Sequence, residues 1–386
     1  MIAISEYDSL YSLYIYALMM LPAIILSFLG KKLKLLDIVI SIAIIISILG
    51  LHAIQLYEFF IFMIFELVLV YTYYAFRKRS SSELIYFMLF SLSMMPIIIV
   101  RLGAHTHYSS YLGFVGMSYI CFKIWQLLID IHDEKIHKLP LVDVFLFLTF
   151  APSFSSGPIS RYEGFCSECN KELKGSDYFN NYFITGIKKL VVGVLYKFAI
   201  AYFINTYIMA NISTKVTFLG SIEYMYAYTV YLFFDFAGYS LIAIGTGYLM
   251  GISLPENFNK PFLARNMKEF WARWHMSLST WFNDYVFSRF VLNNMRNGLF
   301  KNPKYAARVS YMFTMTTMGL WHGFNIHYLL YGIYEGLTLV LTDVYIKTKF
   351  YRKHKKLRYY DIVSRIICFQ IIAFGMLLFS GYLIEY

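Results

Sequence analysis

The chain has 386 residues, of which 59% are hydrophobic and only 15% are charged, and its formal net charge is +11. Ordinary globular domains carry about a quarter charged residues, so this composition excludes a typical soluble fold. The basic residues gather in short loops, as in cytoplasmic loops of membrane proteins, so the positive charge does not indicate nucleic-acid binding. The apolar runs are continuous and do not alternate with polar residues as barrel strands do, so we expect an all-α polytopic membrane protein.

Eleven apolar segments follow one another along the chain. They cover residues 10–29, 36–54, 57–76, 84–100, 111–129, 140–152, 182–208, 221–250, 306–324, 325–343 and 362–384. Segment 140–152 is too short to span a bilayer, so we expect it to be re-entrant or buried in the bundle. Segment 221–250 is long and polar in its second half, so it could bend or break. The first segment is followed by lysines and not by a small-residue cleavage site, so no cleavable signal peptide is expected.

Lysine and arginine residues in the loops predict the orientation in the membrane. KKLK at 31–34 and RKR at 77–79 follow the first and third segments, which puts both on the cytoplasmic face. Both chain termini are then expected outside. The loop at 101–110 is also expected outside, and the loops expected inside are 131–138, 260–308 and 347–358.

One cytoplasmic stretch, EFWARWHMSLSTWF at 269–282, holds three of the five tryptophans. It is too polar to span a bilayer, and with its surroundings at 255–292 it predicts short helices at or just below the interface. An aromatic belt with snorkelling arginines would explain the tryptophans. That explanation gives no particular reason for His275 and the nearby hydroxyls.

His322 is predicted near the outer end of its helix, in MGLWHGFN at 318–325. Ionisable groups inside membrane helices are costly and usually face the bundle interior or a wet cavity. A histidine suits base chemistry near neutral pH, but it can also be a structural residue hydrogen-bonded between helices. Because His275 lies in a cytoplasmic stretch, the two histidines are expected to approach the membrane from opposite sides.

Other polar and small residues in the apolar segments have structural interpretations. A carboxylate such as Asp235 costs roughly 2.5–3.5 kcal/mol at the bilayer centre, so we expect it to be paired or to face a cavity. The glycines at 238, 245, 247 and 251 form a stripe that predicts close helix packing. Cys166 and Cys169 form one CxxC without the second ligand pair of a zinc site, so incidental thiols are expected, with a regulatory disulfide as the alternative.

Several motifs together resemble the membrane-bound O-acyltransferase family. They are WHMSLSTWF, FDFAGYS, NFNKPF, SSGPISR and MGLWHG, and longer matches at 150–159, 250–262, 267–279 and 331–343 resemble the branch that transfers D-alanine in Gram-positive bacteria. The resemblance covers nearly the whole chain, although the first hundred residues match mainly in hydropathy. It implies a single domain, 1–386, with N-terminal helices at 1–130, a catalytic core at 131–345 and a basic loop with the final helix at 346–386. About eleven membrane helices, with short interfacial or re-entrant helices, would form a ring around a thin core.

The same resemblance implies residue roles and partners. His322 matches the catalytic histidine of the family, and His275 matches a second histidine. The donor would be D-alanine on the phosphopantetheine of a D-alanyl carrier protein, and the acceptor lipoteichoic acid or an intermediate acceptor on a small single-pass membrane partner. No metal or bound cofactor is expected. Residues expected along the donor tunnel are Trp271, Arg273, Trp274, Ser277, Ser279, Trp281, Asp235, Asn257 and Trp321, and those expected to dock the carrier are Arg289, Val291, Arg296 and Lys301.

Two alternatives stay open. The first keeps the chemistry but moves another acyl group, such as acetate, onto an exported polysaccharide. The second is a transporter or flippase, because histidines facing opposite sides would also suit a gated pathway. Transporters often contain internal repeats, and none is evident between the halves of this sequence.

Overall fold

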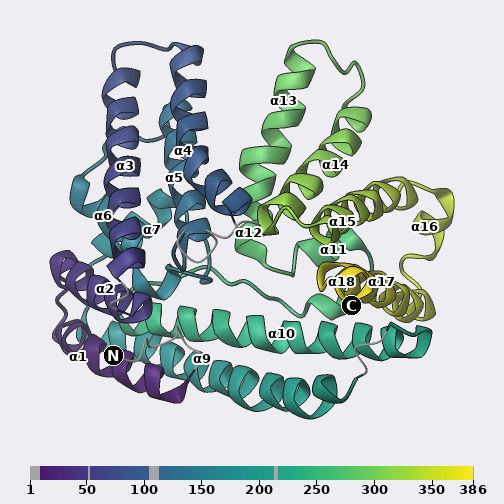
Figure 1. Cartoon of the computed structure of the whole chain (residues 1–386), viewed down its shortest axis with the longest axis horizontal. Helices are drawn as coiled ribbons and strands as arrows, with labels where there is room; N and C mark the ends of the chain where they lie inside the picture. Colours follow the sequence, from purple (N-terminus) through teal and green to yellow (C-terminus); the bar gives the residue numbers. More distant parts are fainter. Residues whose placement is uncertain (1–8, 51–52, 104–112, 213–215, 386) are drawn as a thin grey trace. The chain divides into compact units, whose positions relative to one another are not determined.

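The computed structural model describes residues 9–50, 53–103, 113–212 and 216–385 (Figure 1). All regular elements in these ranges are helical, which confirms the predicted all-α class. Five of the described helices, α1, α3, α4, α10 and α17, are long and apolar enough to cross a membrane. The chain is therefore a membrane protein with several spanning helices, and the number of about eleven stays a prediction. Most of the loop at 101–110, predicted to lie outside, and the extreme ends of the chain are not among the described residues.

The helices divide into two compact units, and the first comprises Met1–Val194 with Tyr239–Pro255. In it α3, α4 and α5 lie side by side (Figure 1). Its helices are α1 (Leu10–Phe28), α2 (Lys34–Leu49), α3 (Ala53–Arg77), α4 (Glu83–Gly103), α5 (Met117–His132), α6 (Leu141–Thr149), α7 (Tyr162–Asn170), α8 (Gly175–Asp177) and α9 (Ile184–Val194), with short turns η2 (Ala151–Ser153) and η3 (Tyr178–Phe183).

Two charged side chains buried inside the first unit, Lys123 and Glu66, make hydrogen bonds to neighbouring groups. Lys123, 1% exposed, donates to the carbonyl of Phe147 at 3.0 Å and to the hydroxyl of Ser153 at 3.1 Å. Glu66, fully buried, accepts from the Ser93 hydroxyl at 2.8 Å. Membrane interiors offer no water to such groups, so these bonds offset the cost of burial.

The second unit comprises Leu195–Gly238 and Glu256–Tyr386. Its long helices α14 and α15 pack directly against each other, and α15 packs against α17. Its elements are η4 (Leu195–Ala201), η5 (Ile204–Ile208), η6 (Met209–Asn211), η7 (Pro261–Leu263), α11 (Met267–Trp271), α12 (Met276–Phe282), η8 (Asn283–Phe287), α13 (Ser288–Arg296), α14 (Pro303–His322), α15 (Ile326–Tyr345), α16 (Lys349–His354), α17 (Arg358–Phe379) and α18 (Tyr382–Glu385).

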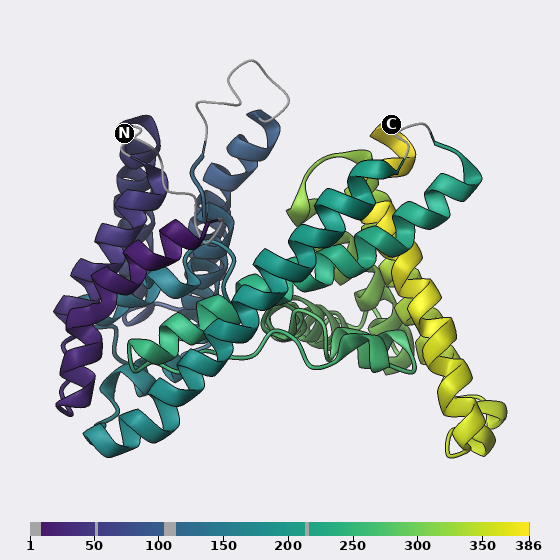
Figure 2. The ribbon, with the colours of Figure 1, turned by 90° about the horizontal axis from the view of Figure 1, so that it is seen from below.

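Helix α10 (Phe218–Leu249) contributes residues to both units and runs beside the segment 184–208 (Figure 2). It continues as one α-helix for 32 residues, so of the two possibilities for 221–250, a bend or a break, the break does not occur. The segment 184–208 changes instead, from the α-helix α9 to the π-helical turns η4 and η5. The predicted glycine stripe does pack closely: a Cβ on Gly245 would lie 2.8 Å from the carbonyl oxygen of Gly186.

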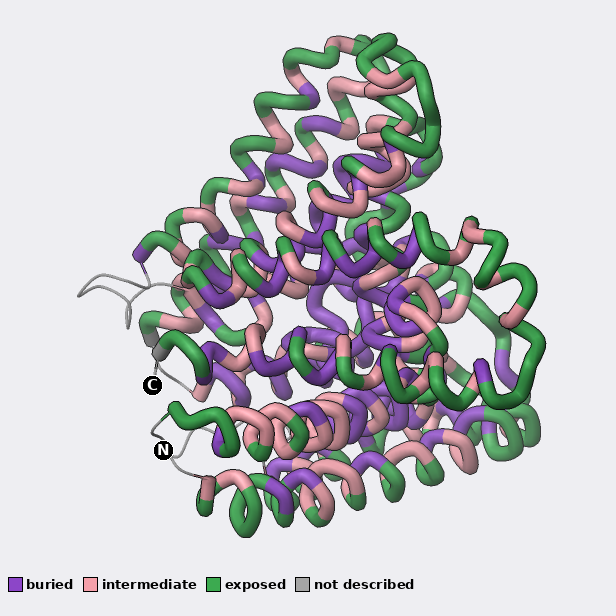
Figure 3. The backbone as a smooth tube through the Cα atoms, turned by 90° about the vertical axis from the view of Figure 1, so that its right-hand side faces the viewer, coloured by how far each residue is buried: buried purple, intermediate pink, exposed green. Residues whose placement is uncertain are grey.

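The long helices bury only part of their circumference. Buried and exposed residues alternate along them with the helical period (Figure 3). Many of the exposed residues are large and apolar, including Ile64, Val191 and Ile366. Apolar residues on the outside suit helices surrounded by lipid, where helix faces need no polar cover.

The stretch 255–292 folds into short helices, as predicted, here η7, α11, α12, η8 and most of α13. All four cysteines carry free thiols in this structure. Burial raises the pKa of Cys166 to about 11, which makes it a poor nucleophile at neutral pH.

Candidate functional site

Every residue predicted for the site belongs to the second unit. His275 stands immediately before α12, and His322 is the last residue of α14. The two are close enough for a positive charge on His322 to disfavour protonation of His275. The fold therefore brings together two histidines that are 47 positions apart in the sequence (322 − 275).

His275 is held in an unusual state. Its backbone adopts φ 41° and ψ 53°, the left-handed region that few side chains other than Gly, Asn and Asp occupy. The residue is 4% exposed, and its ring packs at a nearly perpendicular angle to the Phe236 ring with the ring centroids 4.6 Å apart. Within the described residues, Nε2 has no hydrogen-bond partner. Burial, with a smaller contribution from His322, lowers the pKa of His275 to about 3, so the ring is neutral at physiological pH.

Asn257 fixes the backbone around His275. Its side-chain oxygen accepts from the Ser277 hydroxyl at 2.6 Å and from the Ser277 backbone N–H at 3.3 Å. Its carbonyl oxygen accepts from the N–H of Met276 at 2.9 Å. Asn257 is fully buried, and its Nδ2 has no partner within the described part of the chain. The loop before α11 is thus bound to the first turn of α12.

The three tryptophans of this stretch are nearly buried, at 8%, 5% and 3% exposure for Trp271, Trp274 and Trp281. Trp274 stacks on Phe270 with centroids 5.5 Å apart and meets the edge of Phe258 at 5.0 Å. They lie in the packed interior of the second unit.

Trp271 has a polar partner that the sequence analysis did not identify. Its indole N–H donates to Oε2 of Glu335, on α15, at 3.0 Å, and Glu335 is 1% exposed. Buried indole nitrogens usually find such a partner. The bond joins α15 to α11, the short helix that precedes His275 in the sequence.

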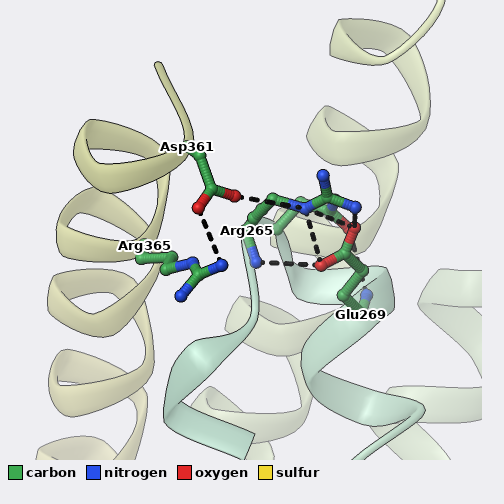
Figure 4. A network of polar contacts seen from close by, with 5 residues as sticks. Arg265, Glu269, Asp361 and Arg365 are labelled. Atoms are coloured by element: carbon green, nitrogen blue, oxygen red, sulfur yellow. Dashed lines mark hydrogen bonds and ion pairs between the residues drawn. The ribbon is translucent and has the colours of Figure 1, made fainter. Parts of the chain in front are cut away.

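A chain of alternating charges ties the start of α11 to α17 (Figure 4). Arg265 binds Glu269 with Nη2 to Oε1 at 2.7 Å, and its Nε lies 3.9 Å from a carboxylate oxygen of Asp361. Asp361 also binds Arg365 at 2.7 Å. These groups are partly exposed, so the network contributes more to orientation than to stability.

His322 lies among aromatic rings. Its ring centroid is 4.6 Å from that of Trp321, 4.8 Å from Phe379, 5.8 Å from Tyr328 and 6.4 Å from Tyr331. The helix ends here because Gly323 turns to extended backbone. The His322 imidazole is thus half-buried and surrounded by aromatic rings.

Three further predicted residues, Asp235, Arg273 and Ser279, make polar contacts with other parts of the second unit. Asp235 is paired, as predicted, with the amine of Lys197 on η4 at 2.9 Å. The carbonyl of Arg273 accepts from the N–H of Asn259 at 2.9 Å, and the Ser279 hydroxyl donates to the carbonyl of Trp274 at 3.0 Å. The first bond joins the loop before η7 to the turn between α11 and α12, and the second joins α12 to the same turn.

The residues predicted to dock the carrier gather on and just after α13. Arg289 and Val291 are half-buried, whereas Arg296 and Lys301 are exposed. Leu292, not predicted, is 67% exposed and adds an apolar residue to this basic surface.

A cavity of about 310 Å³ opens beside the histidine stretch, between the α11–α12–η8 segment and helices α14 and α15. Of the nine residues predicted for the donor tunnel, Trp271 and Ser279 line it. The cavity lining also includes Lys268, Tyr311, Met315 and Met318, none of which was predicted as a site residue. They come from α11 and α14 and meet only in the folded chain.

Comparison with known proteins identifies similar sequences. The model of the membrane-bound O-acyltransferase family matches residues 40–384. The chain is 36% identical to a teichoic acid D-alanyltransferase of Bacillus subtilis over 98% of each chain. It is 34% identical to a protein of the same description from Streptococcus thermophilus, over 94% of this chain and 92% of that protein.

A second group of similar proteins aligns over less of the chain. A probable alginate O-acetylase of Pseudomonas syringae is 30% identical over 69% of this chain and 49% of its own length. The two groups therefore differ chiefly in how much of this chain they match.

Proposed function

Because this chain belongs to the membrane-bound O-acyltransferase family, and is thus an acyltransferase, we propose that it transfers D-alanine to teichoic acid. One observation carries the choice of acyl group. The similarity to teichoic acid D-alanyltransferases extends over 94–98% of this chain in the two relatives above, whereas the similarity to the alginate O-acetylase covers 69%.

In the proposed reaction His322 is the general base. A hydroxyl is a poor nucleophile until a base removes its proton. Neutral His322 would take that proton while the hydroxyl oxygen attacks the thioester carbonyl. The new C–O bond forms, the C–S bond breaks, and the thiol leaves with the proton that His322 accepted. General base catalysis of this kind contributes about 10²–10⁴ in rate.

His275 would position the donor and would not carry a charge. Its burial and its pKa of about 3 support a neutral role, because a protonated imidazole there would be strongly disfavoured. Its Nε2, without a partner among the described residues, could accept a hydrogen bond from the donor arm. Water exclusion by the surrounding rings would protect the thioester from hydrolysis.

The donor would reach the site from the cytoplasm on the phosphopantetheine of an acidic carrier protein. The basic and apolar surface of α13 suits such a partner, since Arg289 and Arg296 can meet acidic residues while Val291 and Leu292 pack. The acceptor, lipoteichoic acid or an intermediate on a small membrane partner, would approach from outside.

Complementation tests this function directly. Cells lacking their own D-alanyltransferase would express this chain, and ester-linked D-alanine and acetate would both be measured after mild alkaline release from the cell envelope. Restored D-alanine esters, with acetate unchanged, support the proposal. New acetate esters without D-alanine would assign the chain to polysaccharide acetylation, and the absence of both with the protein present in the membrane would contradict acyl transfer to these acceptors.

A further inference from the structure

A second cavity, here called the α10 cavity, opens between the η5–η6 segment and the first half of α10, within the second unit. Its volume is about 660 Å³, well inside the range of ligand pockets, about 300–1,000 Å³. Ile204, Ile208 and Ile212 line one side, and Ala227 and Val230 line the other. The turn η5 is π-helical, and π-helical turns are frequent at functional sites. The α10 cavity therefore has the size and the apolar walls of a ligand site.

The α10 cavity is separate from the proposed catalytic histidine. Its lining residue Tyr226 stacks on Phe369 of α17 with ring centroids 6.2 Å apart, whereas His322 lies against Phe379 of the same helix. The two phenylalanines are ten positions apart (379 − 369), which is about 15 Å along a helix axis. A ligand in the α10 cavity would thus not occupy the reaction centre.

One carboxylate lines the α10 cavity, and no lysine or arginine does. Glu223 is exposed and makes no ion pair within the described residues. Lys197, the one cation in the described part of 195–238, is already bound to Asp235 at 2.9 Å. An ionisable residue in a membrane segment is costly and usually marks a functional site with a partner of its own. Glu223 therefore calls for a cationic partner from outside the described chain.

The other polar groups of the lining suit a cation that carries N–H groups. Nδ2 of Asn211 donates to the carbonyl oxygen of Tyr207 at 2.8 Å, which leaves Oδ1 of Asn211 as an acceptor. Tyr226 donates its hydroxyl proton to the side-chain oxygen of Gln370, so its own oxygen can accept. The ring of Tyr207, which is 59% exposed, adds an aromatic face of the kind that attracts ammonium groups.

The orientation predicted from charge puts the start of α10 on the outer side, because residues 260–308, which follow this helix, are expected inside. Glu223 is five positions from Phe218, the first residue of α10, or about 7.5 Å, which is about the depth of the lipid headgroups. We propose that the α10 cavity binds a lipid of the outer leaflet whose headgroup carries a primary ammonium. The ammonium lies on Glu223 and Asn211, and an acyl chain packs on the isoleucines. This goes beyond acyl transfer and does not depend on it.

The length of the α10 cavity favours a lipid over the membrane helix of a protein partner. Its lining on α10 runs from Glu223 to Val230, seven positions, or about 10 Å of helix. A spanning helix needs a contact surface of up to about 30 Å, the thickness of the hydrocarbon core. A headgroup with the first part of one acyl chain matches the shorter length.

Native mass spectrometry of the purified full chain in detergent tests the proposal without any acyl donor. Phosphatidylethanolamine, phosphatidylcholine and phosphatidylglycerol with the same acyl chains are added at equal concentrations. Phosphatidylcholine has no N–H to donate, and phosphatidylglycerol has no ammonium. We therefore expect phosphatidylethanolamine to bind about fivefold more tightly than either, the upper range for an exposed ion pair.

Variants of the lining test which groups hold the headgroup. Glu223→Gln keeps the shape of the side chain and should abolish the preference for phosphatidylethanolamine. Glu163→Gln, at an exposed glutamate on α7, is the matched control and should keep that preference. Glu223→Lys should reverse the preference in favour of phosphatidylglycerol, a gain that misfolding cannot produce. Ala227→Phe, which fills the cavity, should abolish binding of phosphatidylethanolamine.

Three results would overturn the proposal. The first is equal binding of the three lipids by the wild type, and the second is an unchanged preference in Glu223→Gln or unchanged binding by Ala227→Phe. The third is a single-pass polypeptide that copurifies with the wild type, is displaced by phosphatidylethanolamine and is lost from Glu223→Lys, because the α10 cavity would then belong to a protein partner.

Discussion

His275 combines three costly features at one residue: a left-handed backbone, a buried imidazole and an Nε2 without a partner in the described chain. A strained backbone of this type costs of order 1–3 kcal/mol and persists where the surroundings fix it, often at functional sites. Asn257 and the rings of Phe236 and Trp274 provide that fixed environment. A role in positioning the donor would account for a histidine at this place.

The buried state of His275 predicts how stability depends on pH. An unfolded histidine binds a proton below about 6.5, whereas His275 in the folded chain stays neutral down to about 3. Between these values the unfolded state binds more protons, so the free energy of unfolding decreases as the pH falls, by up to about 1.4 kcal/mol per pH unit. Thermal unfolding in detergent at pH 7.5 and 5.0 should show a larger loss of Tm for the wild type than for His275→Asn, which tolerates the same backbone. Parallel losses would contradict the assignment.

The bond from Trp271 to Glu335 gives a second prediction for single residues. Glu335→Gln keeps an oxygen that can accept from the indole, so its stability should stay close to that of the wild type. Glu335→Leu leaves the indole N–H buried without an acceptor and should cost about 1–3 kcal/mol. Thermal unfolding of both variants measures the difference. If the two variants have the same Tm, the hydrogen bond does not contribute to the stability of the folded state.

At the scale of elements, the contact between α14 and α15 sets the position of His322. A Cβ on Gly319 would lie 2.3 Å from the carbonyl oxygen of Tyr328, and one on Gly332 would lie 2.6 Å from that of Met315. The two backbones are therefore in contact at Gly319, three residues before His322. This close approach places the end of α14 directly against α15.

Gly319→Ala should separate these helices. The added methyl group meets backbone, which cannot move aside as a flexible side chain could, so we expect a loss of about 2 kcal/mol or more and a large loss of acyl transfer. Gly164→Ala is the control, because a Cβ at that helical position meets nothing within 4 Å. Expression, thermal unfolding and D-alanine ester content are measured for both. Full activity in Gly319→Ala would show that the close packing does not position His322.

The elements were largely predictable from the sequence because hydrophobic segments mark membrane helices directly. Short helices at 255–292 followed from prolines and the amphipathic pattern. The continuity of α10 was not foreseen, since polar residues such as Ser240 and Thr246 suggested a break, yet Thr246 satisfies its hydroxyl on carbonyls of its own helix. Hydropathy also gave no sign of the π-helical turns in 195–208.

The site was predictable in part. Motifs indicated His275 and His322, but no pattern in one sequence links Trp271 to Glu335, 64 positions apart, or Lys268 to Asp343, 75 apart. Such pairs depend on which helices become neighbours. The pairing of Asp235 was expected from the cost of a lone carboxylate, although its partner Lys197 could not be named.

At the scale of the whole molecule, the charge distribution predicts the orientation. Residues 347–358 hold seven lysines and arginines and no acid, and should face the cytoplasm. In intact cells, a membrane-impermeant maleimide should not label the Lys353→Cys variant. After the membrane is permeabilised, the same reagent should label it. The unmodified chain, with its four native thiols, gives the background. Labelling in intact cells would reverse the predicted topology.

We propose that His322 is the general base for acyl transfer to teichoic acid. The most direct measurement is ester-linked D-alanine in cells that lack their own transferase and express either the wild type or His322→Ala at matched membrane levels. The account predicts that the wild type restores the esters and that His322→Ala reduces them by about 100-fold or more, in line with the loss of a general base. Equal restoration by the two proteins would contradict the account, because His322 would then be only a structural residue.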